Sequence, residues 1–165
     1  MREYIESQMD FSPIFENSYS IYIEKSQIFA KFGDGVKSVE FLTLLPGKKL
    51  YFIEAKSSAP NPDNGEDFKV YCEELLEKFQ HSIDLFASKE LGVHRDSESE
   101  FPDDFKEGFH EYRLYFLLII NNHKQEWCSD VLDGLQRKFI ALRKIWKLEI
   151  IVWTGDKARD KRFIV

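Results

Sequence analysis

Leu50-Tyr51-Phe52-Ile53-Glu54-Ala55-Lys56-Ser57-Ser58 is the stretch that decides both the fold and the function expected of this chain. Its first four residues are apolar or aromatic and follow the turn signal Pro46-Gly47, so they predict a strand. Side chains alternate between the two faces of a strand, so Glu54 and Lys56 share one face. Charged groups at the end of an apolar strand lose hydration, which costs free energy unless a partner compensates. A metal ion and a phosphate group are suitable partners.

A second acidic residue, Glu40, lies in another strand predicted over residues 37–45. The Pro46-Gly47 turn joins this strand to the first one, so the two are expected to form a hairpin. Pairing across the turn would bring Glu40 near Glu54. Two carboxylates can hold one hard divalent cation through oxygen ligands, and Lys56 would then lie beside it. An acid within an apolar strand is also the kind of departure from pattern that marks functional sites.

An acid followed fourteen positions later by Glu-x-Lys on the next strand resembles the motif of the PD-(D/E)xK nuclease superfamily. Members of this superfamily share the restriction-endonuclease-like fold. The resemblance implies that Mg²⁺ or Mn²⁺ is bound by Glu40, Glu54 and the carbonyl group of Ala55. It also implies that Lys56 helps to activate water or stabilises the charged phosphate. The catalytic residues that the resemblance assigns are therefore Lys56, Glu54 and Glu40.

The first acid departs from the usual form of the motif. In the superfamily this residue is usually Asp, often after Pro, whereas the chain has Val39-Glu40. Asp34 is the alternative first acid. Its neighbours Gly33 and Gly35, however, favour a tight turn at this position.

The remaining hydrophobic patterns predict strands that alternate with helices. Strands are expected over residues 19–24, 37–45, 50–56, 114–120 and 148–153, and helices over residues 66–86 and 126–146. A short helix is also predicted within residues 1–9. The order β-β-β-α-β-α-β predicts an α/β fold with a mixed central sheet flanked by helices. The restriction-endonuclease-like core has a similar order, so the resemblance extends in layout over about residues 19–120.

Length and charge set the outer limits of the functional interpretation. The 165 residues suit one domain with its own core, so residues 1–165 are expected to form a single restriction-endonuclease-like domain. The formal net charge is -6, from 23 Lys and Arg against 29 Asp and Glu. This charge argues against broad, sequence-independent attraction to a phosphate backbone. It does not exclude a nuclease, because metal ions cancel part of the negative charge at a site.

Cysteine usage and hydropathy point to the cytoplasm. Cys72 and Cys128 are too few for a disulfide framework and lack the CxxC spacing of zinc sites, so reduced, packed thiols are expected. There is no basic-then-apolar leader, and no apolar run reaches the roughly 18 residues of a membrane span. We therefore expect a cytoplasmic protein that does not associate with membranes.

Other charged residues are alternative candidates for contact with a phosphate. The resemblance implies that the helix after Glu-x-Lys can lend Lys78 or Gln80 to the phosphate, although a solvated helix face is the simpler explanation. The basic residues of the second helix could contact phosphate or simply be solvated: Arg137, Lys138, Arg143 and Lys144. Residues 92–109, by contrast, form an acidic stretch that repels nucleic acid.

These observations predict a Mg²⁺- or Mn²⁺-dependent nuclease that hydrolyses phosphodiester bonds, with DNA favoured over RNA as the partner. A homodimer is the form expected if both strands of a duplex are cut. The alternative is a catalytically inactive restriction-endonuclease-like domain that binds or docks without cutting, since a fold does not fix a function. A third interpretation makes Glu54 and Lys56 an ordinary exposed ion pair, worth roughly 0 to 1 kcal/mol.

Overall fold

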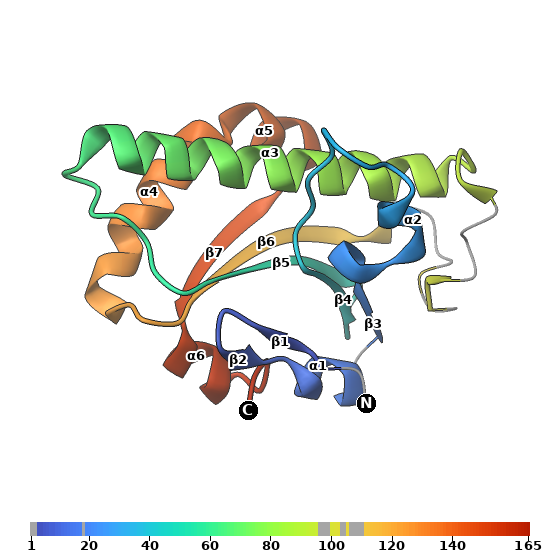
Figure 1. Cartoon of the computed structure of the whole chain (residues 1–165), viewed down its shortest axis with the longest axis horizontal. Coiled ribbons are helices and arrows are strands. Elements are labelled where there is room, and N and C mark those ends of the chain that lie inside the picture. The colour runs from blue at the N-terminus through green and yellow to red at the C-terminus, as the bar shows by residue number, and fades with distance from the viewer. Residues whose placement is uncertain (1–2, 18, 96–99, 103–104, 106–110) are drawn as a thin grey trace.

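Five strands form one sheet through the middle of the molecule (Figure 1). The structure is a computed structural model that describes residues 3–17, 19–95, 100–102, 105 and 111–165. The strands, in their order across the sheet, are β3 (Tyr19–Tyr22), β4 (Phe41–Leu45), β5 (Lys49–Lys56), β6 (Arg113–Ile120) and β7 (Glu149–Thr154). The pairs β3/β4 and β4/β5 are antiparallel, and the pairs β5/β6 and β6/β7 are parallel. The expected α/β fold, with a mixed central sheet and flanking helices, is confirmed.

Helices cover both faces of the sheet (Figure 1). One face carries α3 (Gly65–Glu90), the 3-10 turn η5 (Gln125–Trp127), α4 (Cys128–Lys138) and α5 (Ile140–Trp146). The other face carries the hairpin of β1 (Ile5–Glu6) and β2 (Met9–Asp10), α1 (Ser12–Asn17) and α6 (Gly155–Asp160). The 3-10 turn η1 (Ile23–Lys25) and α2 (Gln27–Ala30) connect β3 to β4. Across the described ranges, no helix is both long and apolar enough to cross a membrane.

The β4–β5 hairpin ends unevenly, and this creates the place for a site. The register runs from Leu45 opposite Lys49 to Phe41 opposite Ile53. On its other edge β5 stays paired with β6 up to residue 56. Residues 54–56 therefore extend beyond the end of β4, and their backbone groups on that edge need partners from elsewhere.

Aromatic rings fill the space between the sheet and α3. The ring of Phe79, which is fully buried, lies 5.2 Å from that of Phe52 on β5 and 5.1 Å from that of Phe116 on β6. It also stacks on Phe139, 5.8 Å away between α4 and α5. One side chain on α3 thus contacts two central strands and the second helical segment. These contacts fix the position of α3 over the sheet.

The helix predicted within residues 1–9 is wrong for the described residues 3–9. Ile5–Glu6 and Met9–Asp10 pair as an antiparallel hairpin instead. Its two connecting residues, Ser7 and Gln8, have φ values of 50° and 63°. A two-residue hairpin turn needs positive φ at these positions, and Gly, Asn or Asp usually supplies it. The turn therefore carries none of its usual sequence signals.

Other predicted boundaries also change in the structure. The strand expected over residues 19–24 ends at Tyr22, and the 3-10 turn η1 follows it. The helix expected over residues 126–146 is interrupted at Phe139, whose φ of -90° and ψ of 13° end α4 before α5 starts. The strand expected over residues 37–45 begins only at Phe41, so Glu40 precedes the strand. The chain leaves the sheet there because the Val39 N–H donates to the Ser82 hydroxyl of α3 at 2.9 Å.

Part of the acidic stretch predicted over residues 92–109 lies outside the described residues, namely 96–99, 103–104 and 106–109. Glu100, which is described, accepts hydrogen bonds from the N–H groups of Gln27 at 2.6 Å and Ile28 at 2.8 Å. These donors belong to the first turn of α2, where a helix leaves its N–H groups without intrahelical partners. Glu100 therefore has a structural role at the start of α2.

Replacing Phe79 by Ala should destabilise the protein by about 3 to 5 kcal/mol, because it opens a cavity among three rings. Gln80→Ala is the matched control, since Gln80 is the next residue of α3 and is exposed. Its effect should stay within about 0.5 kcal/mol. Urea unfolding of the two variants measures both free energies. Equal losses in the two variants would contradict the assigned packing.

Candidate functional site

Glu40 completes the uneven end of the β4–β5 hairpin with its side chain. It lies directly before β4 and is 5% exposed. Its Oε2 accepts a hydrogen bond of 2.8 Å from the N–H of Ala55, a donor that a longer β4 would have paired. Its backbone carbonyl accepts another of 2.8 Å from the N–H of Ile23. Glu40 is thus held at both its backbone and its carboxylate, beside Glu54.

Glu54 is a fully buried carboxylate with two lysine partners. Its Oε1 lies 2.8 Å from Nζ of Lys78 and 3.2 Å from Nζ of Lys56. No hydrogen-bond partner for its Oε2 is found in the described part of the chain, and the same holds for the buried hydroxyl of Tyr71. Burial, and then the charge of Glu54, raises the pKa of that hydroxyl. Glu54 therefore combines full burial with an oxygen that lacks a donor.

Lys78 reaches the Glu54 carboxylate from α3. Ser82, one turn later, fixes the position of the Lys78 backbone. The Ser82 hydroxyl donates to the backbone carbonyl of Lys78 at 2.7 Å and accepts from the Val39 N–H at 2.9 Å. This bridge ties α3 to the residue before Glu40. It places Nζ of Lys78 3.6 Å from Oε1 of Glu40 as well as next to Glu54.

Glu6 joins the site through the β1–β2 turn. The Ser7 hydroxyl donates to the Ala55 carbonyl at 3.1 Å, and Nδ2 of Asn121 donates to the Ser7 carbonyl at 3.0 Å. Positive φ at a residue other than glycine costs free energy, so the strained turn at Ser7 and Gln8 persists only where such contacts hold it. The contacts hold the turn against the carboxyl ends of β5 and β6 and bring Glu6 to the site.

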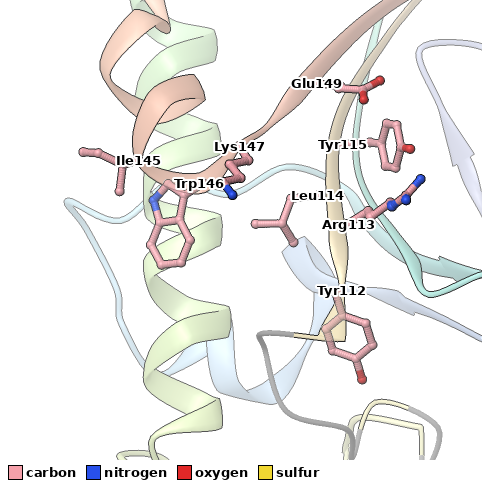
Figure 2. A pocket seen from close by; sticks show the side chains of 8 residues that line it. All are labelled: Tyr112, Arg113, Leu114, Tyr115, Ile145, Trp146, Lys147 and Glu149. Carbon is pink, nitrogen blue, oxygen red and sulfur yellow. The ribbon is translucent and has the colours of Figure 1, made fainter.

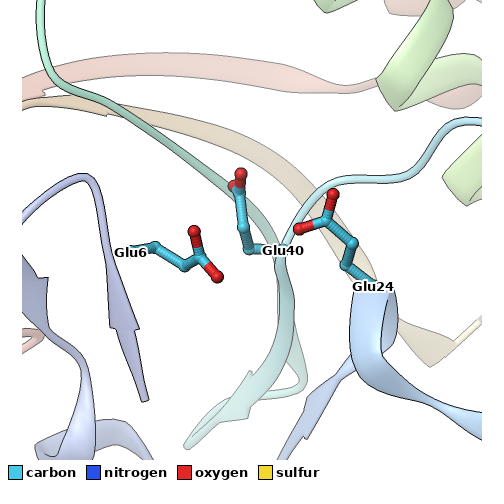
Figure 3. A group of neighbouring side chains, drawn as sticks. All are labelled: Glu6, Glu24 and Glu40. Atoms are coloured by element: carbon cyan, nitrogen blue, oxygen red, sulfur yellow. The ribbon is translucent and has the colours of Figure 1, made fainter. Parts of the chain in front are cut away.

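Glu24 reaches Glu40 from the opposite side. The hydrogen bond from the Ile23 N–H to Glu40 places the η1 turn, and with it Glu24, beside the start of β4. Carboxylate oxygens of Glu6, Glu24 and Glu40 lie within 4.8 Å of one another, and we call these residues the carboxylate triad. Figure 3 shows Glu40 between the other two. The triad runs from buried Glu40 through partly buried Glu6 to exposed Glu24, and it is close enough to hold one metal ion.

The carboxyl groups perturb one another. Burial, followed by the charge of Glu54, raises the pKa of Glu40 to about 9. Burial and the charge of Glu24 raise the pKa of Glu6. Burial alone would lower the pKa of Lys78, but the charges of Glu54 and Glu40 outweigh it and raise the pKa. Without a metal ion, Glu40 therefore keeps its proton at neutral pH, which relieves the repulsion between its carboxyl group and that of Glu54.

These donor atoms fit a hard divalent cation. Carboxylate and carbonyl oxygens are the ligands that Mg²⁺ and Mn²⁺ prefer. The triad offers three carboxylates, and Ala55 offers a carbonyl whose second lone pair is not used by Ser7. Glu54 lies outside this triad, but its Oε2 is buried without a partner among the described residues, and leaving such an atom unpaired is costly. A bound cation would remove that cost.

Compared with protein-family models, with curated proteins and with solved structures, the chain matches none. Its function is therefore inferred from the residues gathered at this site.

The residues of the Glu-x-Lys motif lie together at the end of β5. Glu40, Glu54, the Ala55 carbonyl and Lys56 are neighbours there, while their catalytic and metal-binding roles stay predictions. Asp34, the alternative first acid, is exposed in the turn before β4 and is not part of the carboxylate triad. Glu54 and Lys56 do form an ion pair of 3.2 Å at the end of β5, but the expectation that this pair is exposed is wrong, because Glu54 is 0% exposed.

Of the four basic candidates on the second helix, Lys144 is exposed and the other three make contacts away from the site. Lys138 pairs with Glu73 of α3 at 2.9 Å. Arg137 and Arg143 each donate to a backbone carbonyl on α4, at 3.3 Å and 3.4 Å. Gln80 is exposed on α3, whereas Lys78 is partly buried and contacts both central acids. Of the two candidates on α3, only Lys78 is in contact with the site.

Sequence reasoning named Lys78, together with Gln80, only as an alternative phosphate contact and not as a partner of the acids, and it missed Glu24 and Glu6 as members of the site. For Lys78 a signal was present, because it follows Leu75 by three positions and precedes Ser82 by four, on the buried side of the helix. It interrupts the apolar stripe of α3 as Glu54 interrupts the apolar strand. Glu24 and Glu6 depend on a 3-10 turn and on a strained hairpin turn, for which the sequence carries no comparable signal.

A pocket of about 540 Å³ lies away from these residues, at the amino ends of β6 and β7 (Figure 2). Its lining includes Tyr112, Arg113, Trp146, Lys147 and Glu149. The acids and lysines described above gather at the carboxyl end of β5. Because β5 and β6 are parallel, this end of β5 is opposite the amino ends of the strands, where the pocket lies. The pocket is therefore separate from the candidate site.

The raised pKa of Glu40 predicts how the stability of the metal-free protein depends on pH. The folded state retains a proton that the unfolded state loses, so the free energy of unfolding should fall between about pH 4.5 and 9. The slope from one group is at most about 1.4 kcal/mol per pH unit. Glu40→Gln keeps an acceptor for the Ala55 N–H and should flatten the slope. Urea unfolding in EDTA measures this, with exposed Glu16→Gln as the control that keeps the wild-type slope.

Proposed function

We propose that this chain is a Mg²⁺- or Mn²⁺-dependent phosphodiesterase that cleaves nucleic acid on a restriction-endonuclease-like core. The observation that carries the proposal is the fully buried Glu54, which holds two lysines on one oxygen and has no donor for the other in the described residues. Further support comes from the order of the long elements and from the gathering of acids and lysines at the end of β5.

Glu40, Glu54 and the Ala55 carbonyl would hold the cation. Glu6 and Glu24 add negative charge around Glu40, which favours a divalent ion over a monovalent one. When bound, the cation supplies Lewis-acid activation of water and neutralises charge on the phosphate. The protein would hold these oxygen atoms in place before the substrate arrives, because each carboxylate is fixed by neighbouring backbone or side-chain groups.

Lys56 is the residue best placed to act on the phosphate. Its side chain is 27% exposed, against 18% for Lys78, and it ends β5 at the rim of the site. The buried carboxylate of Glu54 orients the Lys56 ammonium, with Oε1 lying 3.2 Å from Nζ. An ammonium held in this way can stabilise the negative charge that develops on a phosphate during hydrolysis.

Nucleic acid is the partner that this chemistry suits, with DNA favoured over RNA by the resemblance. Cutting both strands of a duplex needs two such sites, so we extend the proposal to a homodimer. The net charge of -6 requires that contact with the phosphates be local and depend on the cation.

The second candidate function is a domain that binds or docks without cutting. The observation that favours it is Lys78, whose ammonium already lies between Glu54 and Glu40 and neutralises part of their charge. If this ammonium takes the place of the metal permanently, the site has no cation and no hydrolytic activity. Titration with a divalent metal separates the two functions, since a non-cutting domain of this kind binds none.

Lys56→Ala should abolish cleavage of a DNA substrate in Mg²⁺ or Mn²⁺ while leaving the fold intact. The fold should stay intact because Lys78 keeps its hydrogen bond to Glu54, so the buried carboxylate retains a cationic partner. Gel assays of cleavage, with circular dichroism as the check on folding, measure both effects. The control is Lys49→Ala at the other end of β5. Cleavage that persists in Lys56→Ala would contradict the assigned role.

Glu24→Gln should weaken Mn²⁺ binding by roughly fivefold or more, because it removes one charge from the carboxylate triad. Glu24 is exposed, so the substitution should not change the stability of the metal-free protein. Calorimetric titration of the purified protein gives the affinity. Glu16→Gln removes an exposed acid outside the triad and should bind Mn²⁺ as the wild type does. Equal affinities for the two variants would remove Glu24 from the metal site.

A further inference from the structure

Lys78 occupies the space between the two buried carboxylates. Its Nζ donates to Oε1 of Glu54 at 2.8 Å and lies 3.6 Å from Oε1 of Glu40. Its side chain is 18% exposed, and the Ser82 bridge holds its backbone in place. Two carboxyl groups buried side by side need positive charge or a proton nearby, because the interior screens their repulsion weakly. In this structure the ammonium of Lys78 supplies that charge.

A metal ion and this ammonium would compete for the same carboxylates. Ligand oxygens lie about 2.1 Å from Mg²⁺, so an ion shared by Glu40 and Glu54 would sit within a few ångströms of Nζ. Cations that close repel each other strongly in a partly buried site. Oε2 of Glu54 can accept an ion, since it has no partner among the described residues, but the ammonium on Oε1 opposes its entry.

We propose that Lys78 is the resident cation of the Glu40–Glu54 pair and that a divalent metal ion displaces its ammonium, which then contacts an anionic phosphate. This rests on the proposed function, from which it takes the metal site. Lys78 thereby makes phosphate binding depend on metal binding. While the Lys78 ammonium is bound to Glu54, the ammonium is not available to a phosphate. Binding of the metal ion releases the ammonium.

The test is calorimetric titration with Mn²⁺ alone, on the full chain of the wild type and of Lys78→Met. Removing the competing charge should tighten Mn²⁺ binding at least about tenfold. The melting temperature of metal-free Lys78→Met should fall, because Glu54 loses its nearest partner, and Mn²⁺ should raise it by more than it raises that of the wild type. If Lys78→Met does not unfold cooperatively, Lys78→Gln removes the charge but keeps a donor for Glu54 and answers the same question.

Two controls separate the loss of this charge from other effects. Lys78→Arg keeps the charge and should keep the wild-type affinity, and Lys69→Met removes an exposed lysine of the same helix and should also leave it unchanged. Wild-type affinity in Lys78→Met would overturn the role of Lys78 and leave the proposed function standing. Binding in Lys78→Met but not in the wild type would overturn both the displacement of the ammonium by the metal and the proposed function, and would leave Lys78 as a permanent partner of Glu54. Binding in neither protein would overturn both.

Discussion

The burial of the Glu54 carboxylate is the constraint on which the rest of the site depends. An ionised carboxylate buried in a sheet loses several kcal/mol of hydration free energy. Only paired charges or a bound proton can compensate for that loss. The surrounding chain answers this requirement with Lys56 from the same strand and Lys78 from α3. Both bind Oε1, so the second oxygen remains without a donor within the described residues. That imbalance is the physical basis for inferring a cation.

The architecture concentrates these groups because of how its central strands end. β4 begins only at Phe41, opposite Ile53, while β5 continues to Lys56. The last backbone groups of β5 therefore lack strand partners on that edge, and side chains must satisfy them. Glu40 fills the vacated edge, and the turn at Ser7 fills the position next to it. A right-handed crossover is the usual connection between parallel strands, and here α3 makes the connection between β5 and β6, with Lys78 over the site. Three separate segments therefore converge where the sheet is incomplete.

Much of the fold followed from hydrophobic patterns, and part of the site followed from local departures from those patterns. The alternation in β5 placed Glu54 and Lys56 on one face, and the Pro46-Gly47 turn implied that Glu40 would lie nearby. What the sequence could not show depends on contacts between distant segments. The 3-10 turn that carries Glu24 and the strained turn after Glu6 are held by tertiary hydrogen bonds rather than by local propensity.

The most direct measurement is a crystal structure with Mn²⁺, in which anomalous scattering locates the ion. The account predicts one strong peak within about 2.3 Å of carboxylate oxygens from both Glu40 and Glu54, with Nζ of Lys78 moved away from Oε1 of Glu54. A map without a peak at saturating Mn²⁺, with Lys78 still 2.8 Å from Glu54, would contradict it. The site would then be a permanently paired set of buried charges.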